Sequence, residues 1–250
     1  MNAPSELVEA VRTARHIVVM TGAGISAESG VPTFRDAQTG LWAQYDPEEL
    51  ATPGAFRRNP SLVWDWYSWR RELVSQAEPN PGHFALAELA ARVPRLTLIT
   101  QNVDGLHQRA GSQDVIELHG NILRVKCSAD GRIIASWPAT NETPPPCPEC
   151  GAPLRPDVVW FGEALPMLAL NWAAKAAEQG DLFLSIGTSA LVHPAASLAY
   201  VALQRKAVVA EINLDPTPLT AVATIAWHGR AGELLPQLLR DAFPGDAFPE

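Results

Sequence analysis

Short apolar runs alternate with helix-like stretches along the chain, and this alternation constrains the fold more than any other feature of the sequence. The runs cover residues 16–20, 96–99, 181–186 and 207–212. Continuous apolar strands of this kind fit a parallel sheet that is buried on both faces. Helical patterns near residues 81–93 and 195–205 lead into two of the runs. The sequence therefore predicts an α/β fold with a doubly wound parallel sheet.

Two segments interrupt this alternation. Residues 31–80 are rich in Trp, Pro and Arg and contain no apolar strand pattern, which predicts a helical insertion or a long loop. Residues 120–157 contain every cysteine of the chain and a run of prolines, which predicts a small module held by a metal or by turns. The sheet domain is then predicted to consist of residues 1–30, 81–119 and 158–240, with a tail at residues 241–250.

Composition excludes several functional classes. The 250 residues carry a net charge of −8, which argues against a nucleic-acid backbone as the main partner. No apolar run approaches the ~20 residues that span a bilayer, so we expect no membrane insertion. Near the N-terminus we expect a helix that Ser5 starts as its cap, and no signal peptide. The three cysteines are an odd number and give no disulfide framework, so we expect a reducing, cytoplasmic setting. Separately, we expect a monomer.

A glycine-rich turn follows the first apolar run. Gly22, Gly24 and Ala27 have the G-x-G-x-x-G/A spacing, which lets a backbone approach a pyrophosphate and present N–H groups to it. The same spacing also occurs in an ordinary tight turn between a strand and a helix. An ordinary dehydrogenase would need a second strand that ends in an acidic residue about 20 residues later, and no such strand is predicted there.

Small polar residues follow the later apolar runs, at residues 100–107, 187–189 and 213–215. In an open α/β sheet, ligands bind outside the carboxyl ends of the strands. Helix capping explains any one of these clusters well. Taken together with the glycine-rich turn, they favour a single nucleotide-binding crevice.

Several blocks of the sequence, taken together, resemble the sirtuin family. They occur in the family's order between about residues 16 and 235. The resemblance implies a Rossmann-like NAD-binding domain with a smaller inserted zinc-ribbon-like and helical module. The blocks are GAGISAESGVPTFR at 22–35, TQNVDGLH at 100–107, HG at 119–120, VVWFGE at 158–163, GTS at 187–189, Asn213, and GRAG at 229–232.

The resemblance implies an enzyme that consumes NAD as a co-substrate while it removes acyl groups from protein lysines. In sirtuins the acyl oxygen attacks C1′ of the nicotinamide ribose and nicotinamide leaves. A histidine then deprotonates a ribose hydroxyl, which takes up the acyl group, so that nicotinamide, free lysine and O-acyl-ADP-ribose are the products. By position, the residues implied to contact NAD are Gly22, Ala23, Gly24, Phe34, Arg35, Gln101, Asn102, Asp104, Gly187, Thr188, Ser189, Asn213 and Ala231.

His119 is the general base that the resemblance implies, and Asn102 and Asp104 are further implied catalytic residues. Imidazole suits this task because its ordinary pKa, ~6.5, lies near working pH. In isolation His119 would be assigned to capping the turn before Gly120, and only the surrounding blocks favour catalysis. We expect a structural role for the neighbouring His107.

One of the blocks resembles the sirtuin strand that pairs with an extended substrate peptide. Pairing through the backbone grips many sequences with little side-chain selectivity, so acyl-lysine proteins or peptides are the expected partners. The residues of this stretch are Val158, Val159, Trp160, Phe161 and Gly162.

The preferred acyl group is indicated by Tyr67 and Arg70, which are spaced i and i+3 on a predicted helix. A phenol beside a guanidinium can bind a carboxylate, and the pair resembles that of sirtuins which prefer acidic acyl-lysines. Ala51 matches the small residue that leaves room for a longer acyl chain. We expect desuccinylase or demalonylase activity with deacetylation as a second activity. A surface arginine beside a packed tyrosine would give the same spacing.

The cysteines indicate an incomplete zinc ribbon. A structural zinc commonly has two Cys-x₂₋₄-Cys pairs as ligands. Cys147 and Cys150 form one pair, but in the other Cys127 is followed by Asp130 where the second cysteine would stand. Either Asp130 completes a structural Zn²⁺ site or zinc binding is weak or lost.

Two other functional classes remain open from the sequence. An ADP-ribosyltransferase or NAD glycohydrolase would cleave the same glycosidic bond but would need neither a peptide-pairing strand nor the Tyr67 and Arg70 pair. A non-enzymatic NAD-sensing module would not need His119, Asn102 and Asp104.

Overall fold

A six-stranded parallel sheet forms the centre of the larger part of the molecule. The computed structural model describes residues 2–31, 46 and 50–245, and the strand order is β3-β2-β1-β6-β7-β8. The chain builds the sheet from β1 outward to β2 and β3 and then crosses to the other side of β1 at β6, and this switch point between β1 and β6 is where such sheets bind ligands. The strands are β1 (Ile17–Thr21), β2 (Leu96–Thr100), β3 (Ile116–Glu117), β6 (Leu182–Ile186), β7 (Val208–Asn213) and β8 (Ile225–His228).

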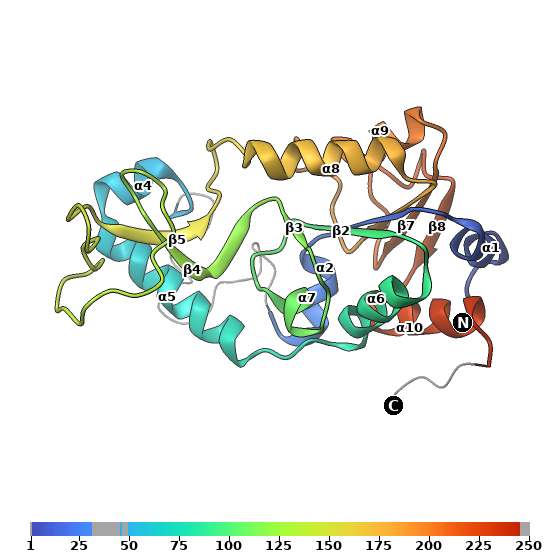
Figure 1. The fold of residues 1–250 in the computed structure, drawn as a ribbon, viewed down its shortest axis with the longest axis horizontal. Helices are drawn as coiled ribbons and strands as arrows, with labels where there is room; N and C mark the ends of the chain where they lie inside the picture. The colour runs from blue at the N-terminus through green and yellow to red at the C-terminus, as the bar shows by residue number, and fades with distance from the viewer. Residues whose placement is uncertain (1, 32–45, 47–49, 246–250) are drawn as a thin grey trace.

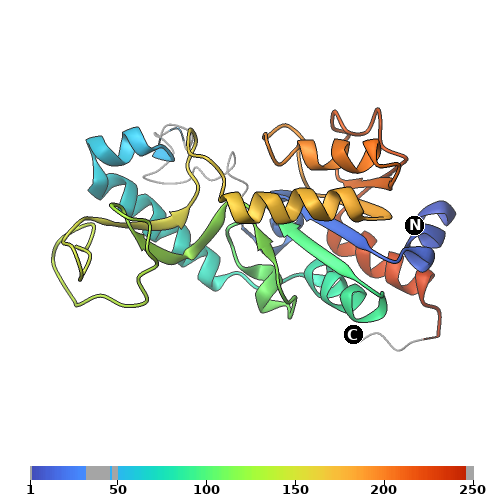
Figure 2. The same cartoon turned by 45° about the horizontal axis from the view of Figure 1, so that its top comes forward.

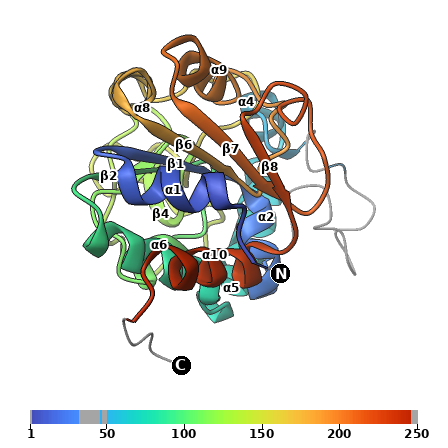
Figure 3. The same cartoon turned by 90° about the vertical axis from the view of Figure 1, so that its right-hand side faces the viewer.

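Helices cover both faces of the sheet, as Figure 3 shows from one end. Ile17 and Val19 of β1 pack in one apolar cluster with α1 (Ser5–Thr13), α6 (Pro81–Arg92) and α10 (Ala231–Ala242). Val18 and Met20 pack on the other face with α8 (Met167–Gln179) and α9 (Ser197–Gln204). Both faces of β1 are therefore buried, which explains its continuous apolar sequence.

A second, smaller unit lies at the end of the molecule opposite α1 and α10 (Figures 1 and 2). It contains an antiparallel sheet of β4 (Gly120–Cys127) and β5 (Leu154–Val158), with α4 (Pro53–Arg58) and α5 (Pro60–Gln76) beside it. Both helices begin with a proline after a side-chain cap, which fixes their starts: Thr52 accepts from Ala55 N–H and Asn59 from Leu62 N–H.

The structure confirms the predicted α/β fold and also corrects it in detail. The predicted cap role of Ser5 is wrong, because Pro4 occupies that position and Ser5 is the first helical residue of α1, without a side-chain cap. The sequence missed β3, which is only two residues long, and β8, in which burial alternates along the strand. None of the helices in the described residues is long and apolar enough to cross a membrane.

Candidate active site

The carboxyl ends of β1, β6 and β7 are joined directly by the backbone. Gly22 N–H donates to Ile186 O over 3.0 Å, and Gly24 N–H donates to Gly187 O over 2.8 Å. Gly187 N–H in turn donates to Ile212 O over 2.9 Å. The glycine-rich turn that includes α2 (Ala23–Ser26) is therefore anchored at the switch point of the sheet.

The glycines of this turn are needed for close approach to the end of β6. A Cβ on Gly24 would lie 2.7 Å from Gly187 Cα, and one on Gly22 would lie 2.8 Å from Gly187 O. The N–H groups of both glycines already donate to main-chain carbonyls, those of Ile186 and Gly187. These glycines bring two strand ends together, which places the turn at the predicted crevice, and their contact with a pyrophosphate stays a prediction.

Thr188 links two other predicted NAD residues, Gln101 and Asn213. Gln101 Nε2 donates to Thr188 Oγ1 over 3.0 Å, and Asn213 Nδ2 donates to Thr188 O over 3.2 Å. Thr188 is buried, whereas Ser189 beside it is exposed. The polar residues that follow β2, β6 and β7 therefore form one connected group, as the sequence predicted.

The start of α10 reaches the same edge. Gly232 N–H donates to Glu28 Oε1 over 2.9 Å, which places Ala231 beside the 3₁₀ turn η1 (Ala27–Ser29). Ala231 is buried and Ala23 is exposed. Two further predicted NAD residues, Phe34 and Arg35, lie outside the residues that the structure describes.

Asn102 and Asp104 are fixed through Ser26. Asn102 Nδ2 donates to Gly22 O and to Ser26 Oγ, both over 3.0 Å, and Ser26 Oγ donates to Asp104 Oδ2 over 2.8 Å. Burial raises the pKa of Asp104, although the hydrogen bonds from the Leu106 N–H and the Ser26 hydroxyl oppose the shift. Sequence reasoning missed Ser26, whose small polar side chain within the glycine-rich block was the available signal.

His107 and His119 have different surroundings. His107 is buried, its Nε2 lies 2.9 Å from Thr21 Oγ1, and burial lowers its pKa to about 3, so it is neutral near pH 7. His119 is only partly buried, and its Nδ1 lies 2.8 Å from Gln101 O. Because a carbonyl only accepts, Nδ1 must carry the proton and Nε2 keeps a free lone pair. Burial also lowers the pKa of His119, although the bond to Gln101 opposes this.

The β4–β5 sheet holds His119 beside the predicted peptide strand. β4 begins immediately after His119, and Gly120 pairs with Val158 at the end of β5. Val159 N–H donates to His119 O over 2.9 Å. Gly120 has φ 81°, and a Cβ there would lie 2.1 Å from Asp157 O, so only glycine fits this close pairing.

Two of the predicted acyl-group residues share a buried apolar cluster with residues of the predicted peptide-pairing stretch. Ala51, Tyr67, Val158 and Trp160 belong to the same buried apolar cluster, and Phe161 N–H donates to Ala51 O over 2.9 Å. Phe161 itself is exposed, as is Gly162. Of the predicted peptide-pairing stretch, only Val158 lies in a strand of the structure, because β5 ends there; the residues that follow it run into a turn.

Arg70 is buried next to Tyr67, with 9% of its surface exposed. Its guanidinium lies over the Trp66 ring, 5.1 Å from the centroid. Burial raises the pKa of Tyr67 above its usual range, and the charge of Arg70 partly opposes this shift. The positive charge of Arg70 therefore acts on the Tyr67 hydroxyl, as the i, i+3 spacing predicted.

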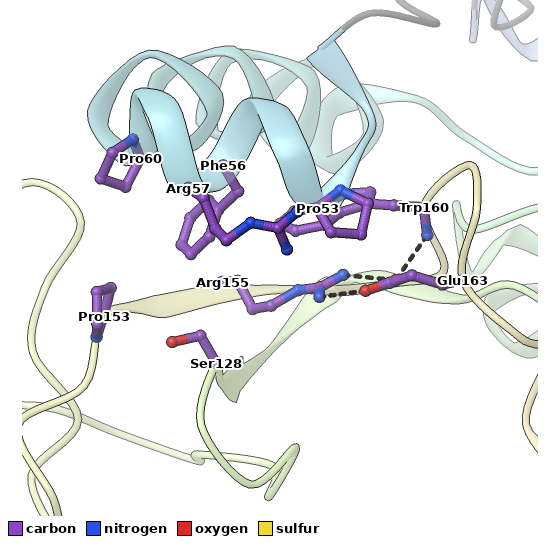
Figure 4. Close-up of a pocket in the computed structure, with 9 residues that line it drawn as sticks. All are labelled: Pro53, Phe56, Arg57, Pro60, Ser128, Pro153, Arg155, Trp160 and Glu163. Atoms are coloured by element: carbon purple, nitrogen blue, oxygen red, sulfur yellow. Dashed lines mark hydrogen bonds and ion pairs between the residues drawn. The ribbon is translucent and has the colours of Figure 1, made fainter.

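A bidentate ion pair that the sequence did not reveal fixes the turn that follows β5. Arg155 Nη1 and Nη2 lie 2.7 and 2.9 Å from the two carboxylate oxygens of Glu163, and Trp160 N–H donates to the same carboxylate over 2.9 Å. Figure 4 shows this pair on the wall of a cavity of about 420 Å³ between α4 and β5. Arg155 also donates to Val158 O over 2.9 Å.

The three thiols form a group that fits a metal ion. The sulfur atoms of Cys127, Cys147 and Cys150 lie within 4.8 Å of one another, and Cys127 Sγ is 3.5 Å from Cys150 Sγ. Tetrahedral zinc with Zn–S bonds of ~2.3 Å would separate its sulfurs by about 3.8 Å. Zinc held here would supply rigidity and no chemistry to the crevice. The Asp130 carboxylate lies outside this group and pairs with Arg132 over 2.7 Å.

Comparison with known proteins identifies relatives of the whole chain. Residues 22–194 match the Sir2 family. NAD-dependent protein deacylase 2 of Pyrobaculum aerophilum is 52% identical over 235 residues, which cover 94% of each chain. The NAD-dependent protein deacylase of Methylococcus capsulatus is 52% identical over 248 residues, which cover 96% of this chain and 97% of the other.

Solved structures show the same fold. A Sir2 homologue in complex with NAD has a TM-score of 0.89 and 46% identity, over 96% of this chain and 93% of the other. A mutant Sir2 homologue in complex with 2′-O-acetyl ADP ribose has a TM-score of 0.88 and 46% identity, over 96% of both chains.

Proposed function

The chain belongs to the Sir2 family and is an NAD-dependent protein deacylase, and on that premise we propose that it removes succinyl and malonyl groups from lysines as well as acetyl groups. The observation that carries this proposal is the guanidinium of Arg70, which lies nearly buried beside Tyr67. Attraction between a guanidinium and a carboxylate is stronger in such an apolar setting than in water. An acidic acyl group would place its carboxylate there.

We propose the following division of labour in the crevice. NAD supplies the ADP-ribose that accepts the acyl group and releases nicotinamide. The residues after β1, β6 and β7, with Ala231, hold its adenosine half and pyrophosphate, while Gln101, Asn102 and Asp104 face the nicotinamide ribose. The connected hydrogen bonds among these side chains support this, because they fix the donors before the substrate arrives.

His119 is proposed to take a proton from a ribose hydroxyl through Nε2. Its Nδ1–H is held by Gln101 O, so the imidazole is fixed in the tautomer that a base requires. The peptide is proposed to pair with residues 158–162. The bond from Val159 N–H to His119 O supports this, since it keeps the base and the peptide strand adjacent.

Peptide dependence of nicotinamide release tests the deacylase reaction on this chain. With NAD present, we expect nicotinamide to form only when an acyl-lysine peptide is added, in step with free lysine. An NAD glycohydrolase would release nicotinamide without peptide, an ADP-ribosyltransferase would modify a protein without deacylating it, and a sensing module would release none. Any of these results would contradict the proposed reaction.

Replacing Arg70 by Met is expected to lower kcat/KM for a succinyl-lysine peptide by about 10–100-fold, because a hydrogen bond to a charged group contributes about 1.5–3 kcal/mol. The same variant should change turnover of the matched acetyl-lysine peptide little. The measurement is kcat/KM on both peptides at saturating NAD.

Arg71→Met serves as the matched control for that experiment. Arg71 follows Arg70 in α5 but donates to Ile122 O over 2.9 Å, away from Tyr67. Its replacement should affect both peptides equally. Equal losses on both peptides in Arg70→Met would remove the acyl assignment while leaving deacylation itself untouched.

The cytoplasmic location and the monomeric state stay predictions, as does the absence of nucleic-acid and membrane partners. All three cysteines are free thiols, as a reducing compartment would keep them. Sedimentation of the purified chain measures the oligomeric state.

A further inference from the structure

The turns that carry the thiols match each other hydrogen bond by hydrogen bond. Cys127 N–H donates to Arg132 O over 2.9 Å, and Cys147 N–H donates to Ala152 O over 2.7 Å. Each turn is also closed by an antiparallel bridge, from Lys126 to Ile133 in the first turn and between two prolines in the second. The backbone therefore forms the same hairpin twice.

The glycines confirm this match. Gly131 N–H donates to Cys127 O over 3.0 Å, and Gly151 N–H donates to Cys147 O over 2.9 Å. Gly131 has φ 75° and Gly151 has φ 76°, so both lie in the same left-handed conformation. The residue before each glycine is the second potential ligand of its turn. Asp130 therefore occupies in the first turn the position that Cys150 occupies in the second.

We propose that Asp130 is the fourth ligand of a metal site with three thiolates and one carboxylate. Carboxylate oxygen is an accepted ligand of zinc, at ~2.0–2.2 Å. Asp130 Oδ1 accepts from Arg132 N–H over 3.0 Å and Oδ2 pairs with the Arg132 guanidinium over 2.7 Å. A carboxylate has lone pairs for a metal as well as for a donor, so Oδ2 turns toward the thiols while Oδ1 keeps its backbone bond.

Glu149 is the competing carboxylate, and the match between the turns argues against it. It lies between Cys147 and Cys150 and forms an ion pair with the same Arg132. Its equivalent in the first turn is Ala129, which offers no ligand atom. Asp130 and Glu149 are similarly exposed, at 42% and 51%, and share a partner, so one serves as the control for the other.

The test compares Asp130→Ala, Asp130→Cys and Glu149→Ala in the full chain, stripped of metal under reducing conditions and reloaded with Zn²⁺ or Co²⁺. Competition with a chelator measures the zinc affinity of each variant, and absorption spectroscopy records its Co²⁺ spectrum. Asp130→Ala should weaken zinc binding at least tenfold, and Asp130→Cys should strengthen it and intensify the sulfur-to-cobalt charge-transfer band. Glu149→Ala should leave both close to the parent.

Two outcomes would overturn the proposal. If Asp130→Ala binds zinc as tightly as the parent, water is the fourth ligand. If Glu149→Ala loses as much zinc affinity as Asp130→Ala, neither carboxylate is a ligand, and both affect zinc binding only through their ion pairs with Arg132. Thermal unfolding of the metal-free variants shows whether each one folds, and Asp130→Cys keeps a ligand in place should Asp130→Ala fail to fold. Because the readout is metal binding, it is independent of the acyl group that the enzyme removes.

Discussion

Replacing His119 by Asn is expected to lower kcat for acyl-peptide turnover by about 10²–10⁴-fold, the usual contribution of general-base catalysis. The amide of Asn can still donate to Gln101 O, where His119 Nδ1 lies 2.8 Å away in the parent, but it has no basic nitrogen. The variant should therefore keep its fold and lose its base. Steady-state kinetics with NAD and an acyl-lysine peptide measure the loss, and thermal unfolding measures the fold.

The pH profile separates a base from a merely structural histidine. Burial places the pKa of His119 below its ordinary 6.5. A base works when deprotonated, so kcat/KM of the parent should rise with pH through a midpoint below 6.5 and then remain level on the alkaline side. His119→Asn should lose this acid limb. Turnover as fast as the parent's in His119→Asn would remove His119 from the reaction.

The convergence of the site could be predicted from the sequence because it follows from the sheet itself. Parallel strands in register end at one edge, so Thr21, Thr100 and Ile186 align across β1, β2 and β6. The small polar residues that follow these strands are therefore brought together, whatever their separation along the chain. Gln101 and Asn213 meet at Thr188 for this reason.

Side-chain pairing across elements was not predictable in the same way. Nothing in the sequence pattern indicates that Arg155 and Glu163 form a buried pair, because the contact depends on the turn that follows β5. The packing role of Gly22 and Gly24 was missed for a related reason. Their spacing predicts a turn, but only the structure shows that the end of β6 lies against it.

Replacing Glu163 by Gln is expected to lower the free energy of unfolding by about 1.5–3 kcal/mol, because the Arg155 guanidinium would lose its charged hydrogen-bond partner. The Arg155 side chain is 10% exposed and that of Glu163 is 25% exposed, so water screens the pair little. Urea unfolding measures the loss. Glu163 also accepts from Trp160 N–H, so the peptide strand should loosen and KM for the acyl-peptide should rise more than kcat falls.

Acid should reproduce the effect of this substitution in the parent. The pKa of Glu163 lies below its ordinary 4.5, because the bonds from Arg155 and Trp160 N–H outweigh the effect of burial. Folding thus favours the ionised form, and its stabilisation is complete above pH 4.5 and lost as pH falls through the lower folded pKa. The parent and Glu163→Gln should therefore converge in stability below that pKa.

A double variant distinguishes the charge pair from general packing. In Arg155→Met with Glu163→Leu, apolar side chains replace both charges, and no unpaired ion remains inside. The double variant should be more stable than Glu163→Gln, although its peptide KM should stay high, since Trp160 N–H and Val158 O lose their partners. If Glu163→Gln unfolds at the same urea concentration as the parent and its peptide KM is unchanged, the Arg155–Glu163 pair does not hold the strand.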